Sequence, residues 1–100
     1  MVPNINRALK SANLGGNNIG DEGAIAISTA LESNNTLTDI DLNGLGCNIK
    51  IGLTGAQAIA KMLVVNRALN SVDLRYNSIP DEGKQQLRDA VKGKNTTLQL

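Results

Sequence analysis

The chain has 100 residues, of which 41% are apolar and only Tyr76 is aromatic, so one small domain with an aliphatic core is expected. Ten basic residues oppose nine acidic ones, and no like-charged run occurs, which argues against binding to nucleic acid. Histidine is absent, which excludes histidine-based metal sites and Ser-His or Cys-His catalysis.

The opening residues, MVPNINRALK, have no apolar stretch of the kind that a signal peptide needs. No segment approaches the ~18 consecutive apolar residues that predict a membrane span, so no membrane contact is expected. The single cysteine, Cys47, has no partner for an internal disulfide, as is common in a reducing compartment. We therefore expect a cytoplasmic protein.

Short strands are predicted at regular intervals. Residues 6–14 read NRALKSANL and residues 66–74 read NRALNSVDL, with six identities in nine positions. In each copy a leucine stands three residues after an asparagine. An alternation of apolar and polar residues follows, which is typical of a half-buried strand. The apolar positions recur in three copies: Leu9, Ala12 and Leu14; Leu37, Ile40 and Leu42; Leu69, Val72 and Leu74. Because Ala12 stands where later copies have Ile or Val, the first strand is expected to bury less.

A polar turn follows the strand in the first and third copies, where Asn17 and Ile19 are matched by Asn77 and Ile79. The fixed place of the two asparagines predicts buried amides that bond to the backbone of neighbouring turns.

Each turn leads into a predicted helix. Asp21-Glu22-Gly23 and Pro80-Asp81-Glu82-Gly83 are start signals, because Asp accepts hydrogen bonds from free backbone N–H groups and acidic charge favours the first turn. In the middle copy, Thr54 and Gln57 have the spacing of a capping box. Apolar residues four and eight positions after three aligned glycines (Gly23, Gly55 and Gly83) predict one stripe along each helix: Ile27 and Leu31, Ile59 and Leu63, Leu87 and Val91.

Strand, turn and helix together form a repeated unit. The units span about residues 9–36, 37–68 and 69–97, with part of a preceding unit at 1–8 and a bare strand at 98–100. A lone unit cannot bury its apolar sides, so the units are expected to stack into one domain.

The units resemble leucine-rich repeats of the ribonuclease-inhibitor type, in the stretches LTDIDLNGLGCNI and LNSVDLRYNSIPDEG. The stretch VDLRYNSIPDEGKQQLRDAVKG is most similar to the C-terminal repeats of NOD-like-receptor proteins. The resemblance implies a short right-handed α/β solenoid with a parallel sheet on the concave side and helices on the convex side. It also implies a non-enzymatic module that uses no cofactor and binds a partner protein through the concave side.

Alternating strand positions are expected to face solvent on the concave side. They are Ser11, Asn13 and Gly15 in the first copy, Asp39, Asp41 and Asn43 in the second, and Ser71, Asp73 and Arg75 in the third. We expect the partner to contact those of the second and third copies: Asp39, Asp41, Asn43, Ser71, Asp73 and Arg75. A structural explanation stays open for Asp41 and Asp73, since similar repeats often carry Asp there for solubility and local hydrogen bonds. Neither catalysis nor metal binding is expected, because an open, wet face does not separate carboxyl pKa values or converge oxygen ligands.

The glycine-rich stretch GLGCNIKIGLTG, residues 44–55, lacks the spacing of a dinucleotide fingerprint and the Gly-Lys-Ser/Thr ending of a P-loop. We interpret it as a repeat insertion, centred on residues 43–51, that carries exposed Leu45, Cys47 and Ile49. The insertion either folds back on the core or projects as a secondary contact for the partner.

Two other functions are compatible with the resemblance. One is a GTPase-regulating fragment, as in Ran GTPase-activating proteins. The other is a structural or capping fragment of a larger repeat array, which would form homo-oligomers through uncapped solenoid ends and exposed strand edges.

Overall fold

Four short strands and three helices alternate along residues 9–100, the part of the chain that the computed structural model describes. The strands are β1 (Ser11–Asn13), β2 (Asp39–Asp41), β3 (Ser71–Asp73) and β4 (Thr97–Gln99). The helices are α1 (Gly20–Glu32), α2 (Leu53–Val65) and α3 (Asp81–Ala90). The expected partial unit at residues 1–8 lies outside the described residues.

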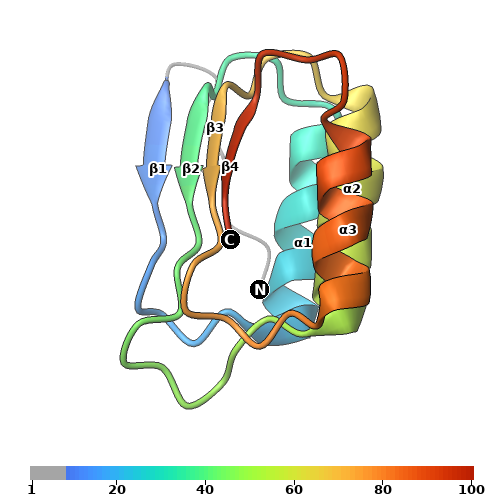
Figure 1. Cartoon of the computed structure of the whole chain (residues 1–100). Coiled ribbons are helices and arrows are strands. Elements are labelled where there is room, and N and C mark those ends of the chain that lie inside the picture. Colours follow the sequence, from blue (N-terminus) through green and yellow to red (C-terminus); the bar gives the residue numbers. More distant parts are fainter. Residues whose placement is uncertain (1–8) are drawn as a thin grey trace.

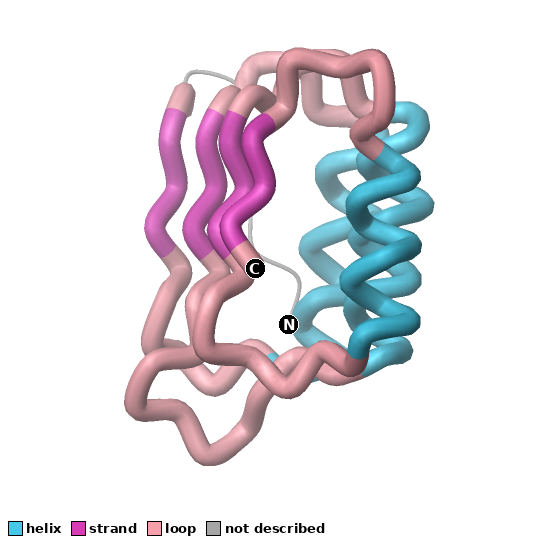
Figure 2. The backbone as a smooth tube through the Cα atoms, viewed as in Figure 1, coloured by secondary structure: helices cyan, strands magenta, loops and turns pink. Residues whose placement is uncertain are grey.

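The strands form one parallel sheet in the order β1-β2-β3-β4, and the helices stack beside it in the same sequence (Figure 1). Figure 2 shows the strands in one layer and the helices together in a second layer on one side of the sheet. The predicted stack of strand-turn-helix units is therefore confirmed.

The sheet pairs the same position of every unit. Ala12, Ile40, Val72 and Leu98 form one row that points toward the helices. Ile40 and Val72 are buried, whereas Ala12 and Leu98 are half-buried because among the described strands β1 and β4 each pair with a single neighbour. The weaker burial expected for the first strand is confirmed.

The apolar stripes of the helices complete the core. Ile27, Leu31, Ile59, Leu63 and Leu87 are each at most 1% exposed, as their helical spacing predicts. Burial of these side chains against the sheet is the main force that holds the units together, at about 1.5–3 kcal/mol for each fully buried aliphatic side chain.

The glycine at the start of α2 has a packing role. A Cβ atom on Gly55 would lie 2.7 Å from Oδ1 of Asp21 and 3.1 Å from Cβ of Ala24, both on α1. Because only glycine lacks that atom, α1 and α2 approach each other closely at this position.

The start of α2 differs from the prediction. Thr54 lies inside the helix, which begins at Leu53, and no side chain of its own N-cap residue bonds to it. The carboxylate of Asp21 in α1 instead accepts the N–H groups of Gly52 and Gly55, with O–N distances of 2.8 and 2.9 Å. The Thr54 capping box is therefore wrong, because the preceding unit supplies the acceptor.

A buried asparagine joins the units at the other end of the helices. Asn66 is 5% exposed, and its amide nitrogen donates to the carbonyl oxygens of Leu31 and Asn34 in the preceding unit, at 2.8 and 3.0 Å. Its Oδ1 accepts the N–H groups of Ala68 and Leu69. One side chain thus satisfies backbone groups of the preceding unit and of the loop that leads from its own unit into the next.

Of the two turn asparagines, only Asn77, which is half-buried, bonds to the backbone of a neighbouring turn as predicted. Asn77 donates to the carbonyl of Leu42 in the neighbouring turn at 3.0 Å and accepts the N–H of Ile51 at 2.9 Å. Asn17 donates to the carbonyl of Leu14 within its own turn. The expected burial is wrong for Asn17, which is exposed because no described turn precedes it in the stack.

Candidate functional site

The face of the sheet turned away from the helices carries two rows of polar side chains. Register pairs Ser11, Asp39, Ser71 and Thr97 in one row and Asn13, Asp41, Asp73 and Gln99 in the other. We call these eight residues the open sheet face. Side chains of β1, β2 and β3, together with Gln99, line a shallow hollow on it. The strand residues predicted to contact a partner are therefore brought together on one surface.

Asp39 and Asp41 supply unpaired negative charge to the open sheet face. Asp39 is exposed and Asp41 is half-buried. Neither forms an ion pair with any residue in the described part of the chain. A hydroxyl of Thr38 lies 3.5 Å from Asp39, too far for a strong hydrogen bond.

Asp73 differs from the prediction of a solvent-facing carboxylate. It is only 6% exposed, because Arg75 folds over it. The guanidinium Nη2 lies 2.8 Å from Oδ2 of Asp73, and Nε lies 3.1 Å from Oδ1. These hydrogen bonds hold the pKa of Asp73 below its ordinary value, although burial acts in the opposite direction. Arg75 is therefore the exposed member of this pair.

Local hydrogen bonds explain why Asp or Asn recurs at the last residue of three strands. Asn13, Asp41 and Asp73 each accept, through Oδ1, the backbone N–H two residues later, at 3.0 Å. This arrangement ends the strand and starts the turn. The structural explanation holds for Asp41 and Asp73, whereas Asp39 makes no such bond.

Asn43 and Ser71 complete the predicted set. Asn43 is half-buried, donates to Oδ1 of Asp41 at 2.8 Å and accepts the N–H of Leu45 at 3.1 Å. Ser71 is half-buried on the open sheet face. The amide of Asn43 therefore fixes the start of the insertion, and Ser71 adds a polar group beside Asp39.

The insertion is anchored to the units on both sides and also projects. Oδ1 of Asn18 accepts the N–H groups of Asn48 and Ile49 at 3.0 and 3.2 Å, and Asn77 holds the far end of the insertion at Ile51. Leu45 and Ile49 are exposed, at 63% and 59%, and the loop extends beyond the carboxyl ends of the strands (Figure 1).

The expected exposure of Cys47 is wrong. Its side chain is 9% exposed and turns into the insertion, where the sulfur lies 3.9 Å from the carbonyl oxygen of Leu45. The backbone of Cys47 also closes a turn onto Gly44. This residue belongs to the folded part of the loop, so it is removed from the set of surface contacts.

Tyr76 is a surface residue that the sequence analysis missed. It is 54% exposed and lies next to Arg75, whose guanidinium carbon is 5.9 Å from the centre of its ring. The alignment of the units could have indicated this residue. Tyr76 occupies the turn position of Gly16 in the first unit, where an exposed aromatic residue is unexpected.

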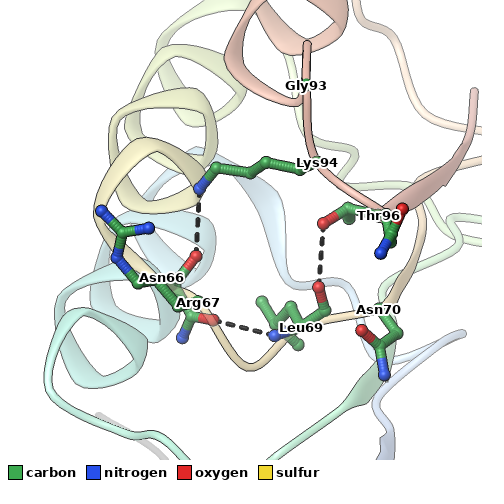
Figure 3. A pocket seen from close by; sticks show the side chains of 8 residues that line it. Asn66, Arg67, Leu69, Asn70, Gly93, Lys94 and Thr96 are labelled. Carbon is green, nitrogen blue, oxygen red and sulfur yellow. Dashed lines mark hydrogen bonds between the residues drawn. The ribbon is translucent and has the colours of Figure 1, made fainter.

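A second hollow lies between the loops that return from the helices (Figure 3). Lys94 points across it and donates to the carbonyl oxygens of Leu63, Val64 and Asn66 at the end of α2. The hydroxyl of Thr96 donates to the carbonyl of Leu69 at 2.9 Å. Because the ammonium group is already occupied by backbone carbonyls, this hollow is part of the connection between units.

Two structural features are absent from residues 9–100. No group of three or more Cys, Asp or Glu side chains among them is arranged to hold a metal ion. No helix in the same range is long and apolar enough to cross a membrane.

Comparison with known proteins matches this architecture. A family model described as Leucine Rich repeat matches residues 6–28 and 65–85. Human NACHT, LRR and PYD domains-containing protein 5 is 36% identical over 93 residues, and mouse ribonuclease inhibitor is 30% identical over 99 residues. This chain is a leucine-rich-repeat protein of the ribonuclease-inhibitor type.

The alignments cover nearly all of this leucine-rich-repeat chain but little of the relatives. They include 92% of the chain and 7% of the human protein, and 93% of the chain and 20% of the mouse inhibitor. A solved structure of leiomodin-1 actin-binding site 2 has a TM-score of 0.80 and covers 93% of this chain and 53% of that chain, at 24% identity. That likeness concerns the leucine-rich-repeat fold.

Proposed function

We propose that the chain is a non-enzymatic protein-interaction module that binds a partner protein through the open sheet face, which corresponds to the concave side of the predicted solenoid. The observation that carries this proposal is the pair Asp39 and Asp41, whose carboxylates have no ion-pair partner among residues 9–100. The mouse relative is by its name an inhibitor of ribonuclease, which supports a protein-binding role for this type of repeat.

The physical basis is preorganisation. The backbone of β2 is held by β1 on one side and β3 on the other. The turn after β2 is fixed because the side-chain oxygens of Asp41 and Asn43 accept backbone N–H groups of the turn. A partner that binds there orders few additional groups, which lowers the entropic cost of association. Leu45 and Ile49 of the insertion offer a secondary contact at the end of the same face.

The test uses a charge reversal that spares the structural hydrogen bonds. Asp39→Lys changes an exposed carboxylate without a strong bond of its own, whereas Asp73 is unsuitable because it is buried. Glu22→Lys is the matched control, since Glu22 is an exposed acidic residue at the start of α1. Proteins captured by the immobilised chain are identified by mass spectrometry, and the main one is purified and titrated.

We expect Asp39→Lys to weaken binding of that purified protein by about tenfold or more, with an unchanged melting temperature, and Glu22→Lys to bind normally. Equal affinities for wild type and Asp39→Lys would refute the open sheet face as the binding surface. The GTPase-regulating and self-associating alternatives stay predictions from the resemblance.

A further inference from the structure

Tyr76 occupies a backbone conformation that its side chain disfavours. Its φ angle is +63°, in the left-handed region, and the residue at the same place in the first unit is Gly16 with φ +75°. A residue with a bulky side chain loses free energy in this region, whereas glycine does not. The turn therefore accepts glycine, yet the third unit carries the only aromatic residue of the chain there.

Core packing does not account for Tyr76. Its side chain is 54% exposed, and it is absent from the buried apolar cluster between the sheet and the helices. A residue with a strained backbone and an exposed side chain contributes little to the stability of the fold. Such positions are concentrated at recognition sites, where the side chain serves a partner.

Leu45 and Tyr76 belong to neighbouring turns at the carboxyl ends of β2 and β3. The N–H of Gly44 donates to the carbonyl of Arg75 at 2.9 Å, so the turns after β2 and β3 run side by side. Both turns follow the carboxyl ends of the strands (Figure 1). We call Leu45 and Tyr76 the apolar rim. They are 63% and 54% exposed, and in the chain they follow Asp41 and Asp73, the last residues of β2 and β3 on the open sheet face.

The charge of the surface next to the apolar rim indicates the chemistry of the partner. The whole chain has a net charge of +1, but the carboxyl ends of β2 and β3 next to the rim carry Asp41 and Asp73. Asp39 adds a third carboxylate at the amino end of β2, on the same face and further from the rim. Arg75 is paired with Asp73. The carboxylates of Asp39 and Asp41 are left to attract a positive group, because opposite charges across an interface favour association.

We propose that the partner presents a cationic segment with a large apolar side chain, whose Lys or Arg groups meet Asp39 and Asp41 and whose apolar group packs on Tyr76 and Leu45. This inference rests on the proposed function and specifies the partner. Tyrosine suits such an anchor, since its rigid ring buries a large area on binding and is common among the residues that dominate binding energy.

Tyr76→Gly separates a recognition role from a structural one. Glycine relieves the left-handed strain, so the melting temperature should rise by about 4 °C or more. Binding of the partner segment should nevertheless weaken by about tenfold or more. Val64→Ala is the control, because Val64 is a similarly exposed apolar residue (59%) on α2, in the helix layer.

A random dodecapeptide library displayed on phage supplies the probe, selected on the immobilised full chain. We expect the selected peptides to be enriched in Lys or Arg together with Leu, Met or an aromatic residue. The strongest peptide, labelled with a fluorophore, is then titrated by anisotropy against wild type, Tyr76→Gly, Val64→Ala, Asp39→Asn/Asp41→Asn and Asp39→Lys. Its affinity should fall with added NaCl, as expected for exposed charge pairs.

The outcomes distinguish this inference from the proposed function. Selected peptides without excess positive charge, or equal affinities for wild type and Tyr76→Gly, would overturn the cationic-apolar partner. If such peptides still lose binding to Asp39→Lys, the open sheet face remains the binding surface and only the partner chemistry is wrong. If binding is insensitive to Asp39→Lys as well, the proposed function fails too.

Discussion

Removal of the Asp21 carboxylate tests how the repeat units are joined. Its Oδ1 accepts the N–H groups of Gly52 and Gly55, which lie 31 and 34 residues further along the chain. Asp21→Ala removes this acceptor from the N–H group of the N-cap residue Gly52 and from that of Gly55 in the first turn of α2. Each bond to a charged acceptor contributes about 1.5–3 kcal/mol, and loss of a helix cap costs about 1 kcal/mol.

The expected loss of stability is about 2–3 kcal/mol, because both bonds share one oxygen and water reaches the half-buried site after the substitution. For a domain of this size the melting temperature should fall by about 10–20 °C. Asp21→Asn keeps a neutral oxygen acceptor, so it should lose roughly half as much. Thermal and urea unfolding followed by circular dichroism measure both variants.

Glu22→Ala is the matched control for Asp21→Ala. Glu22 is the next residue, carries the same charge in the same turn and is exposed. Its removal should change the stability by less than about 0.5 kcal/mol. Faster amide hydrogen exchange at Gly52 and Gly55 in Asp21→Ala would locate the effect at the start of α2. Equal stabilities of Asp21→Ala and Glu22→Ala would refute the role of Asp21 between the units.

Three further changes test a buried amide, the core and the ion pair. Asn66→Ala should destabilise the chain by about 3 kcal/mol in urea unfolding, since four hydrogen bonds lose a partner. Asn70→Ala, at an exposed position, should cost less than about 0.5 kcal/mol. Similar losses of stability in the two variants would contradict the role of the Asn66 amide. Ile59→Ala should cost about 2–5 kcal/mol in the same assay, because Ile59 is 0% exposed, and a loss below about 1 kcal/mol would show that it is not part of a close-packed core. Arg75→Gln should raise the pKa of Asp73 in a ¹³C-carboxyl NMR titration, and an unchanged titration would rule out the ion pair as the cause of the shift. Because the folded-state pKa is lowered, the stabilisation is present above the unfolded-state pKa and is lost as pH falls through the folded-state pKa. Wild type should therefore lose more stability than Arg75→Gln below about pH 4.

The candidate site was predictable where it depends on strand alternation. Alternate residues of a strand point to opposite faces, so Asp39 and Asp41 had to share a face once Ile40 was assigned to the core. The exposure of single residues was less predictable. Cys47 and Asp73 are both covered, one by the path of the insertion and the other by the Arg75 side chain.

The sequence by itself determined the repeated units, their parallel stacking and the apolar side of each helix, because these follow from spacings of two, three and four residues. Only the tertiary structure decided which groups satisfy one another across units. Asp21 was predicted to serve its own helix, but its nearest free donors belong to α2, since Gly55 allows the two helices to approach closely. Contacts between residues about thirty positions apart depend on how one unit packs on the next. The spacing of residues within one unit does not determine that packing.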